Sequence, residues 1–141
     1  MSGCGHDDLA ESILEQMADA VIFADATGTI VRWNRAATAL FGYSAAEALG
    51  QKLDLIIPEH LRAPHWIGFE AAMTKGVMRL QGRPTLTRAT HQTGHKIYVE
   101  MTFALVAARP GGAALGAVAV ARDVTERIER QRTDARRDSA G

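Results

Sequence analysis

The chain has 141 residues, of which 47% are hydrophobic and 23% are charged, which is enough apolar material for one domain with a single core. Its 16 basic residues balance its 16 acidic residues, so it has no broad positive field that would hold nucleic acid or an anionic membrane surface. The composition therefore predicts neither a nucleic-acid partner nor a membrane partner.

The only cysteine, Cys4, lies in a polar start that lacks the apolar core of a secretory signal. No apolar run long enough to span a bilayer follows it. We therefore expect a reduced, cytoplasmic chain without disulfides. The chain also contains neither G-x-S-x-G nor G-x-x-x-x-G-K-[ST], and we expect no enzymatic activity.

The first third of the chain predicts a helix, a hairpin and two short helices. Residues 7–18 form an amphipathic helix capped by Asp7 or Asp8, and "AVIFADATGTIVRWN" forms two strands joined by a turn at "DATG". In the stretch that follows, Gly42 ends one short helix, and Ser44 with Glu47 caps a second.

A longer helix is predicted from His60 to about Lys75, with one apolar stripe. The stripe residues recur every fourth position and are Leu61, His65, Phe69 and Met73. Pro64 lacks a backbone donor and suits a first turn, so we expect the regular helix to begin there, after a turn built from "PEHL". His65 then faces the core.

The remainder predicts three strands and an exit helix. Residues 79–90 form an edge strand because they contain Pro84, and "HKIYVEMTFALVAA" alternates strictly. "AALGAVAVARDV" suits a strand that is covered on both faces, and the polar end predicts a helix that fades into a disordered tail. This order predicts an α+β fold, with an antiparallel sheet and helices grouped on one face.

Three segments resemble the PAS family over most of the chain. They are "AVIFADATGTIVRWNRAATALFGYSAAEALGQKL", "HQTGHKIYVEMTFALV" and "GAVAVARDVTERIERQ". The resemblance implies a PAS fold with a five-stranded antiparallel sheet, short helices on one face and flanking helices at both ends. It divides the chain into an N-terminal tail and helix (1–18), a PAS domain (19–124) and a signalling helix with a tail (125–141). It implies a sensory or dimerising module that signals through its terminal helices.

The segment "IPEHLRAPH" resembles the I-P-x-x-L-R-x-x-H segment of the haem-binding PAS oxygen sensors of bacterial kinases and phosphodiesterases, which act in two-component and cyclic-dinucleotide signalling. By that match His65 is the proximal ligand of a haem b iron. Gly68 and Ala72 keep the wall beside the macrocycle low. The resemblance also gives distal positions to three apolar residues and a propionate partner, namely Leu80, Met101, Phe103 and Arg79.

The chain departs from these sensors at the positions of their gas-contacting arginine and iron-binding methionine, where it has Thr85 and Arg83. Arg83 is the residue that would assist bound oxygen, although strand alternation places it on the water side. For His65 the other interpretation is a core histidine that fixes its helix against the sheet. A flavin photoreceptor would need a reactive cysteine in the helical middle of the fold, and this chain has none there.

Two hypotheses about function follow. One is a small-ligand sensor, most specifically a haem-based gas sensor through His65. The other is a cofactor-free module in which the N-terminal helix and the small-residue face of "GAVAVA" form a homodimer. An effector protein or a downstream domain would receive the signal. The histidines at 60, 91 and 95 have no accompanying cysteine or carboxylate cluster, and we expect them to be solvated.

Overall fold

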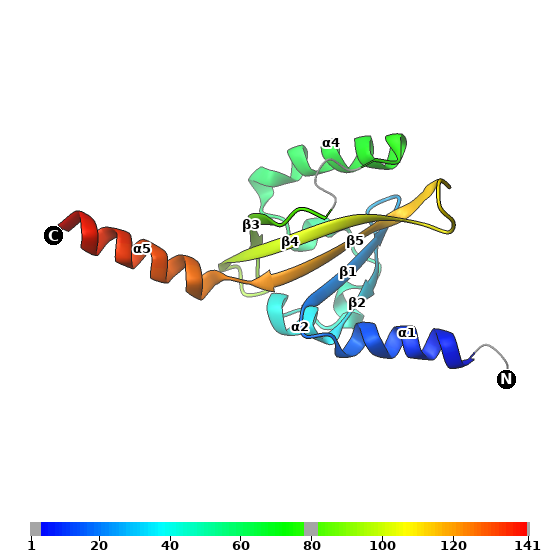
Figure 1. The fold of residues 1–141 in the computed structure, drawn as a ribbon, viewed down its shortest axis with the longest axis horizontal. Coiled ribbons are helices and arrows are strands. Elements are labelled where there is room, and N and C mark those ends of the chain that lie inside the picture. The colour runs from blue at the N-terminus through cyan, green and yellow to red at the C-terminus, as the bar shows by residue number, and fades with distance from the viewer. Residues whose placement is uncertain (1–3, 78–81, 141) are drawn as a thin grey trace.

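The computed structural model describes residues 4–77 and 82–140. Five strands form one antiparallel sheet in the order β2-β1-β5-β4-β3 (Figure 1). The strands are β1 (Ala20–Asp25), β2 (Ile30–Trp33), β3 (Thr85–Thr90), β4 (Lys96–Ala107) and β5 (Ala114–Asp123). The helices are α1 (Cys4–Gln16), α2 (Arg35–Phe41), α3 (Ala45–Ala48), the 3-10 helix η1 (Leu53–Leu55), α4 (Glu59–Lys75) and α5 (Thr125–Ala140). The predicted α+β architecture is confirmed.

The hairpin β1–β2 and the two short helices form where turn and cap chemistry predicted them. The Asp25 carboxylate accepts hydrogen bonds from the backbone N–H of Thr27 and Thr29, and the hydrogen bond from the Thr27 hydroxyl is the main reason that the pKa of Asp25 is lowered. Ser44 and Glu47 form a reciprocal capping box at the start of α3.

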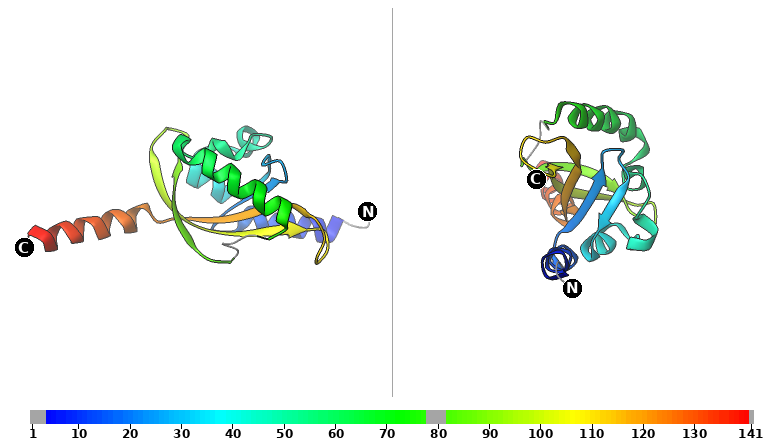
Figure 2. Two further views of the ribbon diagram at one scale, coloured as in Figure 1. Left: turned by 90° about the horizontal axis from the view of Figure 1, so that it is seen from above. Right: turned by 90° about the vertical axis from the view of Figure 1, so that its right-hand side faces the viewer.

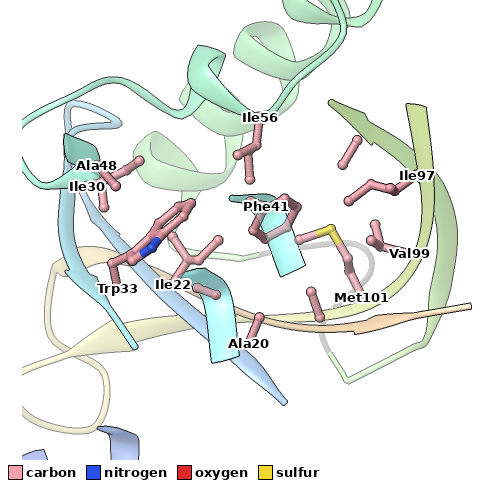
Figure 3. Close-up of a cluster of buried hydrophobic side chains, with 13 residues drawn as sticks. Ala20, Ile22, Ile30, Trp33, Phe41, Ala48, Ile56, Ile97, Val99 and Met101 are labelled. Carbon is pink, nitrogen blue, oxygen red and sulfur yellow. The ribbon is translucent and has the colours of Figure 1, made fainter. Parts of the chain in front are cut away.

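The core lies between the sheet and the middle helices (Figure 3). Strand β4 turns alternate residues toward it, as predicted, and β3 pairs only with β4 at the edge of the sheet. Strand β5 is central, and Ala119 and Ala121 face the core. The largest fully buried side chains are Phe41, Ile22, Ile30 and Val99.

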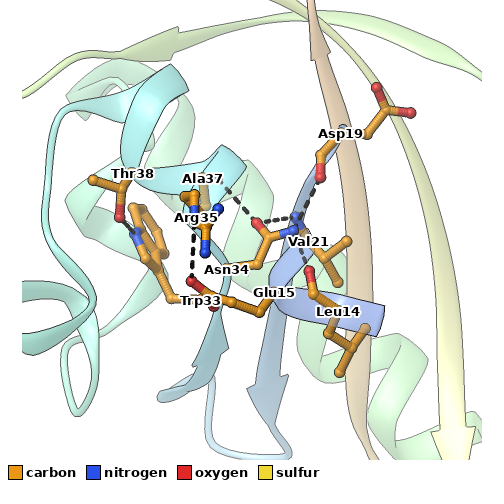
Figure 4. Close-up of polar contacts among 9 residues, drawn as sticks. All are labelled: Leu14, Glu15, Asp19, Val21, Trp33, Asn34, Arg35, Ala37 and Thr38. Carbon is orange, nitrogen blue, oxygen red and sulfur yellow. Dashed lines mark hydrogen bonds and ion pairs between the residues drawn. The ribbon is translucent and has the colours of Figure 1, made fainter. Parts of the chain in front are cut away.

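Asn34 is a buried polar residue that joins three segments (Figure 4). Its Oδ1 accepts from the backbone N–H of Val21 and Ala37, which caps α2. Its Nδ2 donates to the carbonyls of Leu14 and Asp19, at 2.7 and 3.1 Å. All of its hydrogen-bonding capacity is therefore used, and the end of α1 is tied to the sheet.

Helix α4 begins at Glu59, so the expected start at Pro64 is wrong. Pro58 occupies the cap position with extended backbone, and the Leu61 N–H donates to its carbonyl at 2.9 Å. Arg62 donates to the carbonyls of Ile57 and Asp54 and so holds the chain that enters the helix. Pro64 lies in the second turn on the exposed side, where a proline removes only one helical hydrogen bond.

The two terminal helices lie at opposite ends of the molecule, as Figure 1 and the left view of Figure 2 show. Helix α1 begins at Cys4, so it extends beyond the predicted caps at Asp7 and Asp8. Helix α5 continues to Ala140. The expectation of a disordered tail is therefore wrong for the residues up to Ala140, which are helical. None of the helices in the described ranges is long and apolar enough to cross a membrane.

Tyr98 of β4 holds the start of α5. The Val124 N–H donates to the Tyr98 carbonyl, and the Tyr98 N–H donates to the Thr125 hydroxyl, both at 2.9 Å. The Arg132 guanidinium lies 5.0 Å from the centre of the Tyr98 ring. These contacts fix the direction in which α5 leaves the sheet.

Candidate functional site

His65 lies on the inner face of α4, which crosses over the core face of the sheet (Figures 1 and 2). Its ring contacts Trp66 edge-on and lies 5.8 Å from the ring of Phe69, which is buried one turn further on. Its Nδ1 is buried and has no hydrogen-bond partner within residues 4–77 and 82–140. An unpaired buried nitrogen is rare in a folded protein, because a buried polar atom without a partner costs free energy, so this atom is a candidate contact for a bound group.

Burial lowers the pKa of His65, and the nearby Asp54 carboxylate opposes that shift. The imidazole is therefore neutral at physiological pH, and one of its nitrogens carries a free lone pair. A neutral imidazole is the form that binds iron and other transition metals.

Trp66 fixes the part of α4 that carries His65. Its indole N–H donates to Oδ1 of Asp54 at 2.7 Å. Its ring lies against Gly28 in the β1–β2 turn, so closely that a Cβ on Gly28 would stand 2.2 Å from a ring carbon. Trp66 is thus a packing residue of the turn, and its orientation is set by contacts with two other segments of the chain.

The other predicted site residues fall into three groups. Ala72 is buried on the His65 face of α4, while Met101 is buried and Phe103 is packed against the core from β4. Gly68 is exposed, and a Cβ added there would meet no atom within 4 Å. Arg83 is exposed in the segment before β3, and Arg79 and Leu80 lie outside the described residues.

The sequence interpretation missed Asp54, the hydrogen-bond partner of Trp66. It also missed an open groove of about 310 Å³ beside the start of α4. The signal for Asp54 is weak, because a carboxylate 12 positions before an indole has no helical or strand relation to it. The groove is lined by His60, Leu61, Leu86, Thr87, Arg88 and Tyr98.

The β3–β4 turn brings His91 and His95 together, with stacked rings 4.4 Å apart and the Thr93 hydroxyl bonded to both Nδ1 atoms. The described part of the chain contains no group of three or more histidine, cysteine or acidic residues that could hold a metal ion. His91 also packs against Gly42, where an added Cβ would stand 2.6 Å from its ring. The pair stabilises the turn against the end of α2.

A search of curated proteins finds relatives much longer than this chain. An uncharacterized protein of Azorhizobium caulinodans is 33% identical over 122 residues, which are 86% of this chain and 16% of that protein. The sensor protein FixL of Bradyrhizobium diazoefficiens is 43% identical over 54 residues, which are 38% of this chain and 11% of FixL. The chain therefore matches only a small part of each relative.

Solved structures with the same fold are PAS and related domains. A PAS domain of a Colwellia psychrerythraea protein aligns with a TM-score of 0.72 at 21% identity, over 86% of this chain and 98% of that one. An RNA-binding light-oxygen-voltage receptor aligns with a TM-score of 0.70 at 25% identity, over 99% of this chain and 38% of that one. The family model described as the PAS fold matches residues 9–124. The chain belongs to the PAS family of sensory domains.

Proposed function

We propose that this PAS domain is a ligand sensor in which His65 is the proximal ligand of a haem iron. The observation that carries the proposal is the buried Nδ1 of His65, which has no hydrogen-bond partner in the described chain. The segment around it resembles that of haem-binding PAS oxygen sensors, and one relative is named as a sensor protein. A haem held by His65 would supply an iron that can bind a diatomic gas.

The residues around His65 fit such a group in chemistry. The imidazole is neutral, and the small side chain of Ala72 leaves the inner face of α4 low beside it. Met101 and Phe103 supply an apolar wall on β4. Arg83 is exposed, so the proposal gives it no contact with a bound gas. The chain's own contribution is to present a neutral nitrogen on a helix whose position Trp66 fixes.

Signalling then depends on how His65 is connected to the rest of the fold. A ligand that pulls on the imidazole pulls on α4, and Trp66 passes that displacement to Gly28 and Asp54. The β1 strand begins at the Asn34 network, which holds α1. The terminal helices carry the change to an effector protein or domain. The ligand at His65 and the effector then shift the same equilibrium between two conformations of the domain.

An absorbance spectrum tests the proposal directly. Protein purified from haem-supplemented cells should show a sharp Soret band that shifts on reduction with dithionite and again with carbon monoxide. The His65→Ala variant should lose the band while its circular dichroism stays unchanged. His60→Ala, at an exposed position on the same helix, should keep it. A featureless spectrum of the wild type, or an unchanged spectrum of His65→Ala, would remove haem ligation by this residue.

A second function, homodimerisation without a cofactor, is favoured by one exposed apolar surface. Leu9 and Ile13 of α1 are 59% and 54% exposed. The alanines of "GAVAVA" face the core, so the expected small-residue dimer face is wrong, and the apolar residues on the outer side of β5 are Val118 and Val120. In a homodimer, α1 and the outer face of β5 would pack against the partner subunit and bury both of these apolar surfaces.

Sedimentation velocity separates the dimer from the monomer. The variant with Leu9→Glu and Ile13→Glu should sediment as a monomer where the wild type is a dimer. Leu49→Glu introduces a charge at another exposed apolar position, 44% exposed, and should leave the dimer intact. A wild-type monomer at high micromolar concentration would contradict dimerisation.

A further inference from the structure

The outer edge of β3 presents backbone groups that have no partner in the described chain. The His91 N–H bonds to His95 across the β3–β4 turn, whereas the Thr90 N–H points the other way and bonds to the carbonyl of Ile56. Strand geometry repeats every two residues, so Leu86 and Arg88 point their N–H and C=O groups away from β4, as Thr90 does. Within residues 4–77 and 82–140 no other backbone group bonds to those two.

The unpaired edge coincides with the open groove of about 310 Å³ beside α4. Leu61 lines the groove from α4, and Leu86, which is 52% exposed, lines it from β3. Ile56 already closes the Thr90 end of the edge. Ile56 therefore lies where a sixth strand beside β3 would begin. Further along the same edge, no described residue pairs with the backbone of Leu86 or Arg88.

The charge in the groove favours an anionic occupant. Arg88 is exposed and forms no ion pair or side-chain hydrogen bond within the part of the chain that the structure describes. His60 lines the same groove from α4, and none of the described residues that line it is a carboxylate. Exposed edges are often protected by a cation, but here the cation stands over an apolar hollow between a strand and a helix.

We propose that this groove binds an extended acidic peptide of a partner protein, which adds to β3 as a further strand. Main-chain hydrogen bonds to Leu86 and Arg88 supply the affinity. Leu86 and Arg88 lie on the same face of β3, because side chains on a strand repeat every two residues. The carboxylates of an alternating peptide meet Arg88 on that face, while its apolar residues point to the other face and pack on Leu61 of α4. Tyr98 lines the same groove and holds the start of α5, so a bound peptide contacts the residue from which that helix leaves. The inference does not depend on haem binding.

The test uses the full chain and a short synthetic peptide in which glutamate and valine alternate, with blocked ends. Binding should shift the amide resonances of Leu86 and Arg88 in nuclear magnetic resonance spectra and slow their hydrogen exchange. The same peptide with methylated backbone nitrogens has the same charge but cannot donate, and it should bind at least about tenfold more weakly. Equal binding of the two peptides would overturn strand addition.

Two pairs of variants locate the site. Leu86→Pro removes the outward N–H without touching the β3–β4 ladder, and it should weaken binding at least about tenfold relative to Leu86→Ala, which keeps that donor. Arg88→Glu should weaken binding by about as much, while Arg83→Glu makes the same charge change outside the groove and should have little effect. Shifts in β3 that grow with protein concentration without peptide would instead identify a second copy as the occupant and overturn the proposal.

Discussion

The indole N–H of Trp66 donates to Oδ1 of Asp54 at 2.7 Å, which ties the helix that carries His65 to the 3-10 helix before it. The same indole rests on Gly28 in the β1–β2 turn. One side chain therefore fixes the position of His65 relative to two other segments, the 3-10 helix η1 and the β1–β2 turn.

Replacing Trp66 with phenylalanine keeps an aromatic ring near Gly28 but removes the hydrogen bond to a carboxylate. We expect a loss of about 1.5–3 kcal/mol in the free energy of unfolding, measured in urea. Asp54→Asn should cost less, because an amide oxygen still accepts. If the double variant loses as much as the sum of both single variants, the two residues are not coupled.

The close contact at Gly28 gives a second prediction with an internal control. Gly28 and Gly50 both have positive φ angles, 82° and 86°, so an alanine at either is strained by about 1–2 kcal/mol. Only at Gly28 does the added Cβ meet another group, the ring of Trp66. Gly28→Ala should therefore lower the melting temperature more than Gly50→Ala. An equal effect of the two would mean that Trp66 moves away without cost.

The accepting Oδ1 and the donating Nδ2 of Asn34 can be tested separately by substitution. Asn34→Asp keeps the acceptor for Val21 and Ala37 but loses the donor to the carbonyl of Leu14. We expect Asn34→Asp to speed hydrogen exchange in α1 while α2 stays protected, and Asn34→Ala to expose both helices. Each unsatisfied buried group costs about 1–3 kcal/mol. Uniform exchange in Asn34→Asp would contradict a separate role in holding α1.

The lowered pKa of His65 gives a pH dependence of stability with a definite sign. The unfolded chain has the ordinary histidine pKa of 6.5, and burial holds the folded value below it. Above pH 6.5 both states are neutral at this position and stability is complete. As the pH falls from 6.5 toward the folded pKa, only the unfolded state takes up the proton, and the free energy of unfolding falls.

The comparison with His65→Leu isolates this effect, because the other four histidines are present in both proteins. Urea unfolding between about pH 7.5 and pH 5 should show a weaker decline in the variant than in the wild type. Equal declines would show that His65 is protonated as easily in the folded state as in the unfolded one.

The elements with local signals were predictable from the sequence. Alternation along β4 placed Val99 and Met101 in the core, and Pro84 placed the strand predicted over residues 79–90 at the edge of the sheet. That strand begins only at Thr85, so the expectation that it contains Pro84 is wrong. The capping box at Ser44 and the stop at Gly42 fixed two short helices. These signals operate within a few residues, where propensity and hydrogen bonding decide the backbone.

The start of α4 and the surroundings of His65 depend on side-chain contacts that follow no helical or strand repeat. Arg62 satisfies carbonyls of the preceding turn and thereby allows the helix to begin before Pro64. Trp66 meets Gly28 only because the β1–β2 turn folds over α4. No periodicity in the sequence encodes such contacts, so the stripe that contains His65 was predicted but its partners were not.

The joint at Tyr98 makes α5 a lever. Its 16 residues extend about 24 Å from the hydrogen bonds at Val124 and Thr125. A tilt of about 10° at that joint displaces the far end of the helix by about 4 Å. A displacement of β4 too small to break a single strand hydrogen bond is therefore magnified, at the distal end of α5, to nearly the spacing between neighbouring strands.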